Sequence, residues 1–370
     1  MTPADVFARL GGDLVDPPIV LPASLPLELS GEAVRARLCV FPGADGEEQA
    51  LRPDLTLPVV MDEVARRKAG EMGERVVRYD ARAFRLPATQ GDPLEFTQTG
   101  FERFGAPSDA DADARAFALV CVAAESAGVG KASARFGDLA VFPAFVDALG
   151  LANGMADALK RAFRQAGGVK ALLEARPREA AHGLAARLRG ATPAEAEAIV
   201  QDIFALAGIQ PQGLRTLDEI VERLLQQAEE SERGGVPDLV RQTLEAVMAV
   251  DCPPDRAADA LLGIARQAGL DGLDDMLQRL SVRADMMAEL VPGFVASARF
   301  GTPFGRRFNY YDGFLFELFS PEPADWMHPF GAGGRYDTVL SRLSGGDVDA
   351  TAIGGVVRPD RLALVTGDRA

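Results

Sequence analysis

Histidine and cysteine are scarce in this sequence of 370 residues, which has two His and three Cys. Cys39, Cys121 and Cys252 are far apart and form no CxxC or Cys/His group, which disfavours a disulfide framework and a zinc site. Only His182 and His328 are available for a Ser-His-Asp arrangement or a two-His metal site. We therefore expect no metal and no catalytic triad.

An excess of positive charge and a long apolar run are also missing. Asp and Glu outnumber Lys and Arg by 54 to 39, for a formal net charge of −15. Because affinity for nucleic acid comes mainly from Lys and Arg, we expect no nucleic-acid partner. No apolar run approaches the roughly 18 residues of a membrane-spanning helix, and the N-terminus does not resemble a signal peptide. The sequence predicts a soluble, cytoplasmic protein that does not bind membranes.

The pattern of apolar residues divides the chain into two kinds of segment. Strands and helices alternate up to about residue 140, and strands return from about residue 291. Between them one helical stripe follows another, and Thr192 to Glu195 reads as a capping box with Pro193 at the first helical position. We expect an α+β protein in which residues 1–140 and 291–370 form one discontinuous domain. Residues 141–290 would be a helical insertion.

Several shorter elements are also predicted. Residues 75–85 and 94–103 read as paired antiparallel strands, which places Gln98 and Glu102 on the same face. The same kind of pattern predicts strands at 35–41 and 294–300 and, from its glycines, a tight turn at 331–334.

Four separated segments together resemble the histidyl-tRNA synthetases. These are RPDLT at 52–56, FRLPATQGDPLEFTQTGFERFG at 84–105, GRRFNYYDG at 305–313 and GAGGRYD at 331–337, and they occur in the family's order. The segment AIGGVVRPDR at 352–361 resembles an altered motif 3 of the class II synthetases. The resemblance implies an antiparallel sheet flanked by helices, with a helical insertion, usually assembled as a dimer.

The same resemblance implies a pocket for histidine. Acidic side chains would meet the ammonium group, an arginine the carboxylate, and tyrosines the flat ring. The residues implied are Asp54, Thr56, Arg85, Gln98, Glu102, Arg306, Tyr310 and Tyr311, with Gly333 and Gly334 as pocket backbone.

Structural roles for these residues stand as alternatives. Arg85 and Glu102 could form a buried ion pair, Tyr310 and Tyr311 could be strand core, and Asp54 could cap the following helix.

The sequence departs from the synthetase pattern in the segments that bind ATP in the synthetases. Arginines of the motif 2 loop bind ATP phosphates in the synthetases, but no Arg lies between Leu86 and Leu94, and Asp92 is present instead. Arg358 stands where motif 3 has a small Gly, whereas Arg361 is retained. The chain ends at Ala370, so we expect no anticodon-binding domain. We expect no catalytic residues and no cofactor.

A synthetase-like chain with these departures resembles the regulatory subunits of ATP phosphoribosyltransferase. The resemblance implies a non-catalytic subunit that activates a short catalytic subunit in the first step of histidine biosynthesis. It would form a hetero-oligomer and bind histidine as a feedback signal. Two alternatives remain open: a divergent enzyme that still activates histidine with ATP, and a synthetase-derived binding module for another protein.

Overall fold

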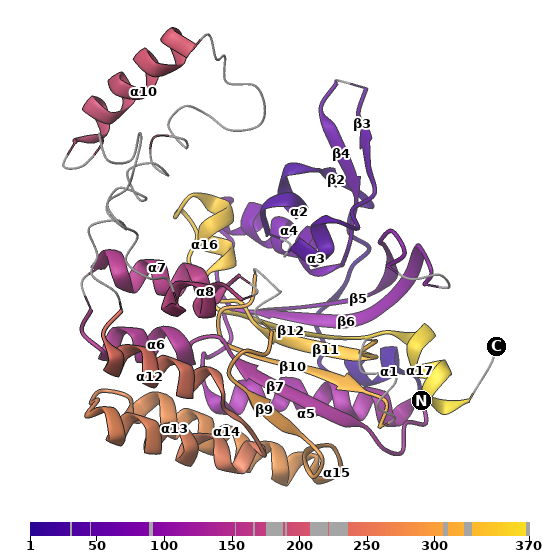
Figure 1. Ribbon diagram of the computed structural model, residues 1–370. Helices are drawn as coiled ribbons and strands as arrows, with labels where there is room; N and C mark the ends of the chain where they lie inside the picture. Colours follow the sequence, from indigo (N-terminus) through magenta and orange to yellow (C-terminus); the bar gives the residue numbers. More distant parts are fainter. Residues whose placement is uncertain are drawn as a thin grey trace.

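A mixed sheet of nine strands is the centre of the molecule (Figure 1). In chain order its strands are β1 (Asp13–Leu14), β5 (Arg75–Phe84), β6 (Glu95–Phe104), β7 (Ser133–Asp138), β8 (Asp251–Cys252), β9 (Arg299–Gly301), β10 (Phe314–Phe319), β11 (Gly331–Arg335) and β12 (Ala352–Val357). The computed structural model describes residues 1–29, 32–44, 46–88, 92–151, 153–165, 167–174, 188, 191–207, 221, 236–305, 310–321 and 328–367.

The spatial order of this sheet is β1-β5-β6-β12-β11-β10-β7-β9-β8. The pairs β1–β5 and β7–β9 are parallel, and the other neighbours are antiparallel. The sheet is thus predominantly antiparallel, as predicted, with a parallel pair towards each edge. A second, antiparallel sheet has the order β2-β4-β3. Its strands are β2 (Val20–Pro22), β3 (Val40–Pro42) and β4 (Glu48–Leu51).

Helices cover both faces of the large sheet. In chain order they are α1 (Pro3–Ala8), α2 (Ser24–Leu29), α3 (Glu32–Arg35), α4 (Thr56–Lys68), α5 (Ala110–Ser126), α6 (Val141–Ala148), α7 (Asn153–Phe163), α8 (Gly168–Glu174), α10 (Pro193–Ala207), α12 (Asp238–Met248), α13 (Pro254–Ala268), α14 (Asp274–Leu290), α15 (Pro292–Val295), α16 (Val339–Ser344) and α17 (Pro359–Thr366). Helix α5 packs under β11 and β12, and α4 lies on the opposite side with α16 beside it (Figure 1).

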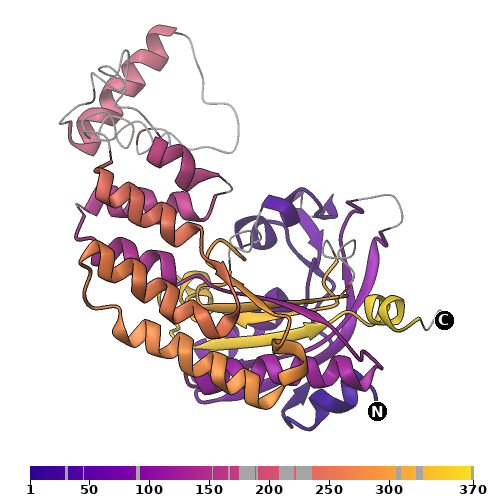
Figure 2. The same cartoon turned by 60° about the horizontal axis from the view of Figure 1, so that its bottom comes forward.

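Helix α5 begins at an effective cap and buries one apolar face. The Asp109 side chain accepts a hydrogen bond from the Ala112 amide, which satisfies one of the free donors at the helix start. Phe117 and Val120 are fully buried against the sheet. The outer side of α5 is covered by α14, next to which α13 lies (Figure 2).

A buried ionic network joins α14 to the sheet. Arg283 of α14 donates to Asp113 of α5 at 2.9 Å and to Asp138 of β7 at 2.7 Å. Asp113 also accepts a 2.8 Å bond from Arg335 of β11. All four side chains are buried, and each charge has an opposite partner, which such burial requires. The network fixes α14 to α5 and to strands β7 and β11 of the sheet.

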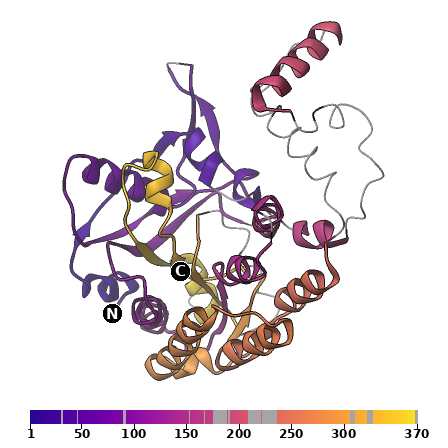
Figure 3. The same cartoon turned by 90° about the vertical axis from the view of Figure 1, so that its left-hand side faces the viewer.

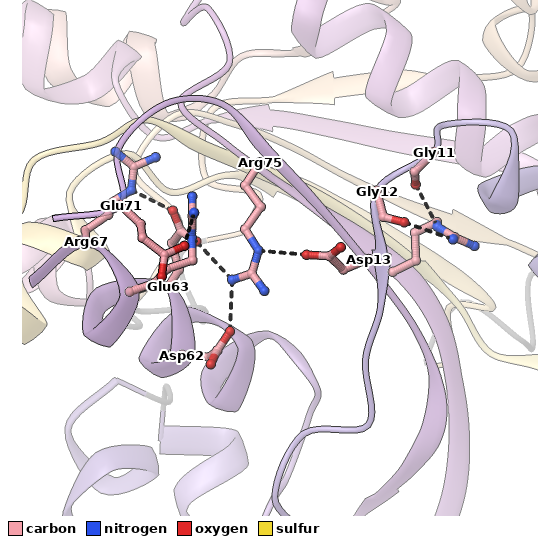
Figure 4. A network of polar contacts seen from close by, with 10 residues as sticks. Gly11, Gly12, Asp13, Asp62, Glu63, Arg67, Glu71 and Arg75 are labelled. Atoms are coloured by element: carbon pink, nitrogen blue, oxygen red, sulfur yellow. Dashed lines mark hydrogen bonds and ion pairs between the residues drawn. The ribbon is translucent and has the colours of Figure 1, made fainter. Parts of the chain in front are cut away.

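A second polar network fixes the opposite edge (Figure 4). Arg75 at the start of β5 contacts Asp13 of β1 at 3.2 Å, and Asp62 and Glu63 of α4 at 2.9 and 3.1 Å. Glu63 is fully buried and also binds Arg67 at 2.6 Å. The position of α4, whose first residue reaches the candidate site, is therefore fixed by ion pairs of Asp62 and Glu63 with Arg75 of β5.

Residues 141–290 are rich in helices: α12, α13 and α14 lie side by side next to the sheet, whereas α10 stands away from it (Figure 1 and Figure 3). The predicted capping box is confirmed: the Thr192 amide donates to the Glu195 carboxylate at 2.8 Å, and α10 begins at Pro193. This range also supplies β8 to the edge of the large sheet. The division into a discontinuous domain and an insertion stays a prediction, and residues 208–220 and 222–235 of the predicted series of helices lie outside the described residues.

Three element predictions differ from the structure. The segment 331–334 is not a tight turn but most of the buried strand β11. Glycine is needed there for close packing: a Cβ on Gly333 would lie 2.5 Å from the Gly354 carbonyl oxygen and from the Phe316 ring. Of 35–41 only the end is strand, and of 294–300 only the last two residues, because α3 and α15 occupy the starts of these regions. A short apolar run in the sequence does not distinguish a strand from a helix.

Candidate functional site

A pocket opens on the α4 side of the large sheet. It is built from the start of α4 and from strands β5, β6, β10, β11 and β12. Its polar and aromatic lining consists of Asp54, Thr56, Tyr79, Arg85, Gln98, Glu102, Tyr310, Tyr311, Phe316, Glu317, Arg358 and Arg361. We call Asp54, Gln98 and Glu102 the acidic end, and Arg85, Arg358 and Arg361 the arginine end.

Glu102 on β6 is the most enclosed carboxyl group of the pocket, with 1% of the residue exposed. It accepts hydrogen bonds from the hydroxyls of Thr56 at 2.7 Å, Tyr79 at 3.0 Å and Tyr336 at 2.5 Å. Burial raises the pKa of Glu102 to about 7, against the lowering effect of the three hydroxyls. Near neutral pH the group is therefore divided between its two forms, and a cation beside it would favour the carboxylate.

Gly354 of β12 makes room for Glu102. The two residues are directly paired across β12 and β6, and a Cβ on Gly354 would overlap the Glu102 Oε2 atom. Gly333 and Gly334 lie on the neighbouring strand β11 and keep the strands close: a Cβ on Gly334 would lie 2.7 Å from the Phe314 carbonyl oxygen. The lining residues of β11 are Gly331 and its neighbour Ala332.

Asp54 and Gln98 meet the first turn of α4. The Asp54 carboxylate accepts a 3.0 Å bond from the Leu57 amide, and the Gln98 side-chain oxygen accepts one of 3.0 Å from the Leu55 amide. Asp54 thus satisfies a helix-start donor and also lines the pocket. Burial raises its pKa, and the nearby Arg85 acts in the opposite direction. The capping role and the pocket role are therefore compatible.

Tyr310 and Tyr311 form an aromatic wall. Their ring centroids are 4.4 Å apart, and Tyr336 lies 6.1 Å from Tyr310 in an edge-to-face arrangement. Burial raises the pKa of both wall phenols, so they stay protonated and able to donate. Behind the wall, Arg164 donates to the Tyr311 carbonyl at 2.7 Å, which connects the α7–α8 region to the pocket.

The arginine end adjoins the acidic end at Arg85, which is close enough to Asp54 to lower its pKa. Arg85 donates to the Pro53 carbonyl at 2.7 Å and Arg361 to the Pro329 carbonyl at 2.8 Å. Arg85 does not pair with Glu102, so the ion pair considered from the sequence is not formed. Burial, together with the like charges of Arg358 and Arg85, lowers the pKa of Arg361 to about 10. This region is electrostatically suited to an anion.

Asp92, which lies before β6, contacts residues near it in the structure. The Asp92 carboxylate accepts a 3.2 Å bond from the Ala88 amide and lies 3.7 Å from the Arg37 guanidinium. Arg37 also donates to the Leu86 carbonyl at 2.6 Å. The residue that replaces a phosphate-binding arginine in the sequence comparison thus stabilises the loop itself.

Among the described residues, no group of three or more His, Cys, Asp or Glu is placed to hold a metal ion. Within the same part of the chain, no helix has both the length and the apolar character needed to cross a membrane.

Comparison with known proteins shows the family of the chain. The profile of the histidyl-tRNA synthetase family matches residues 2–202 and 195–362. An ATP phosphoribosyltransferase regulatory subunit from Chelativorans sp. is 32% identical over 99% of this chain and 96% of its own length. One from Allorhizobium ampelinum is also 32% identical, over 97% and 95%. The chain belongs to the ATP phosphoribosyltransferase regulatory subunit family.

Solved structures agree on the fold of this regulatory subunit family member. An ATP phosphoribosyltransferase regulatory subunit/histidyl-tRNA synthetase from Bacillus halodurans superposes with a TM-score of 0.62 at 19% identity, covering 98% of this chain and 77% of the other. A histidine–tRNA ligase subunit from Alicyclobacillus acidocaldarius gives 0.54 at 21% identity, covering 99% and 90%. The synthetase-like fold predicted from the sequence motifs is confirmed.

Most of the site residues expected for such a regulatory subunit come together. Asp54, Thr56, Arg85, Gln98, Glu102, Tyr310 and Tyr311 all line the pocket. Arg306 lies outside the described residues. The sequence analysis did not select Tyr79, Tyr336 or Glu317. A lone carboxyl residue in the otherwise apolar strand FLFELF was a usable signal for Glu317, and Tyr336 belongs to the GAGGRYD segment itself.

Proposed function

We propose that this chain is a non-catalytic regulatory subunit that activates a short ATP phosphoribosyltransferase chain in the first step of histidine biosynthesis. The observation that carries the proposal is the near full-length similarity to proteins with that name, at 32% identity over 99% of this chain for one of them. Because the similarity spans both the sheet-bearing segments and the helical segment, it supports the function of the whole chain.

The non-catalytic role is supported by the region where a synthetase holds ATP. The loop between Leu86 and Leu94 has no arginine in its sequence. Asp92 of this loop is bound by the Ala88 amide and lies close to Arg37. A triphosphate near this loop would meet a carboxylate where a transferase or ligase of this kind needs positive charge.

The ligand that we propose for the pocket is free histidine. The acidic end offers Asp54 and Glu102 to an ammonium group, the tyrosine wall offers a flat face to a ring, and Arg85 carries the charge that a carboxylate requires. Opposite charges at the two ends favour a zwitterion over a molecule with a single charge. The residues proposed for binding are Asp54, Thr56, Arg85, Gln98, Glu102, Arg306, Tyr310 and Tyr311.

Feedback follows if histidine binds the inhibited assembly more tightly than the active one. Thermodynamic linkage then makes the effect reciprocal. Histidine changes the affinity of this chain for the catalytic partner by some factor, and the partner changes the affinity for histidine by the same factor. We propose a hetero-oligomer with the short catalytic chain and a dimer of this chain within it.

The activation proposal is tested by mixing. The short catalytic chain encoded by the same organism is assayed for phosphoribosylation of ATP with and without this chain. We expect the two chains to co-purify and the rate to rise at least tenfold. This chain alone should show no histidine-dependent exchange of pyrophosphate into ATP. Failure to co-purify, or exchange by the isolated chain, would contradict the proposal.

A further inference from the structure

Arg358 occupies an unusual place at the arginine end. The carbon of its guanidinium group lies 3.6 Å from the centre of the Phe96 ring, which is contact distance for stacked flat groups. No further layer of atoms fits between them. Arg358 is among the residues that line the pocket, and Phe96 behind it is not.

This guanidinium is held in its plane. Its Nε and terminal nitrogen donate to the two carboxylate oxygens of Asp360 at 2.9 and 2.6 Å. Such a two-point bond fixes the orientation of the flat group as well as its position. The Arg358 amide also donates to the Phe330 carbonyl at 2.7 Å, and the residue is 8% exposed. The Arg358 guanidinium is therefore a fixed part of the pocket wall and not a mobile surface side chain.

Two more cations surround the covered ring. The Arg85 guanidinium lies 5.5 Å from the Phe96 centre, and Arg361 lines the same end of the pocket. Removal of the Arg358 side chain would uncover an aromatic face beside two arginines, and it would also leave the Asp360 carboxylate without this partner. That combination suits a flat ring that carries phosphate groups.

We propose that Arg358 is a specificity-determining residue that covers the Phe96 face and so limits the pocket to a ligand of single-amino-acid size, excluding flat nucleotides. This inference deepens the proposed function, since it names what keeps the regulatory pocket from accepting ATP. Under this proposal, ATP is excluded by the Arg358 side chain as well as by the loop that lacks arginine.

The test is a calorimetric titration of the isolated full chain with ATP. Wild type should give no saturable heat up to about 1 mM ATP. R358G should bind ATP with a dissociation constant at least tenfold lower than this concentration. R358M, which keeps the ring covered without a charge, should behave as wild type. Histidine titrated into each variant reports whether the amino-acid part of the pocket is intact.

Three results would overturn the inference: ATP binding by wild type equal to that of R358G, no gain of ATP binding by a folded R358G, or an equal gain in R358M. If R358G does not fold, R358A is judged by the same criteria. These results are independent of the catalytic partner. A failed activation assay together with ATP binding by R358G would reject the proposed function and leave this inference intact.

Discussion

The acidic and arginine ends of the pocket hold their charges in different ways. Glu102 receives hydrogen bonds from side-chain hydroxyls that come from α4, from β5 and from the residue after β11. Arg85 and Arg361 instead donate to the backbone carbonyls of Pro53 and Pro329.

The difference concerns how much of the fold each end depends on. A carboxyl group held by three separate elements is correctly placed only when all three are packed, so small changes there disturb several elements at once. Each of these two arginines is bonded to the backbone carbonyl of one other segment, 32 residues away in the sequence. The like charges of Arg361, Arg358 and Arg85 oppose one another, so losing one cation relieves a repulsion. We therefore expect the acidic end to be the less tolerant of the two.

The largest effect is expected from Gly354→Ala at the acidic end. The added methyl group would overlap Glu102 Oε2, and its strand has neighbours on both sides. Overpacking of this kind should lower the free energy of unfolding by about 3 kcal/mol in urea titration. Gly263→Ala is the matched control: a Cβ there meets nothing within 4 Å in α13, and stability should rise by up to about 1 kcal/mol. Equal effects of the two substitutions would contradict the steric explanation.

Glu102→Gln should change the pH dependence of stability. Because the pKa of Glu102 is raised from 4.5 to about 7, the folded state holds its proton over a pH range in which the unfolded state has lost it. The contribution of Glu102 to stability is complete below pH 4.5 and is lost as pH rises through 7; it amounts to about 3 kcal/mol.

Urea titrations at pH 5 and pH 8 measure this contribution. The decrease in wild-type stability between the two values should be clearly smaller in Glu102→Gln. Asp54 and Asp312, whose pKa values are also raised by burial, remain in both proteins and provide a common background. An unchanged difference would show that Glu102 titrates as an ordinary carboxyl.

The smallest effect is expected at the arginine end. Arg361→Met loses the bond to the Pro329 carbonyl but also removes a partly buried cation from the vicinity of Arg358 and Arg85. We expect a change within about 1 kcal/mol in the free energy of unfolding. Thr56→Val, which removes one hydroxyl from Glu102, should cost more, about 2 kcal/mol. The reverse order would show that the comparison of the two ends is wrong.

The sequence contained enough to predict the hairpin and the pocket side of β6. Alternation placed Gln98 and Glu102 on one face, and both line the pocket. The motifs predicted the position of Thr56 and of the tyrosine wall, since these depend on short segments whose order is easily recognised. The capping box before α10 was equally local, because its bonds join residues three apart.

The sequence did not reveal features that depend on long-range pairing. GAGG at 331–334 reads as a turn, and its strand character follows from neighbours such as Phe316 and Gly354 that are distant in the sequence. The same holds for Arg358, whose contact with Phe96 joins two strand-end regions more than two hundred residues apart. Local patterns carry no information about such contacts.

The claim that the pocket recognises an amino acid through its acidic end is tested most directly by calorimetry. Histidine is titrated into this chain mixed with the short catalytic chain, using wild type and Glu102→Gln, and imidazolepropionate serves as a ligand without the amino group. We predict saturable histidine binding by wild type, at least tenfold weaker binding by Glu102→Gln, and no binding of imidazolepropionate. Identical isotherms for wild type and Glu102→Gln, or no histidine binding by wild type, would contradict the account.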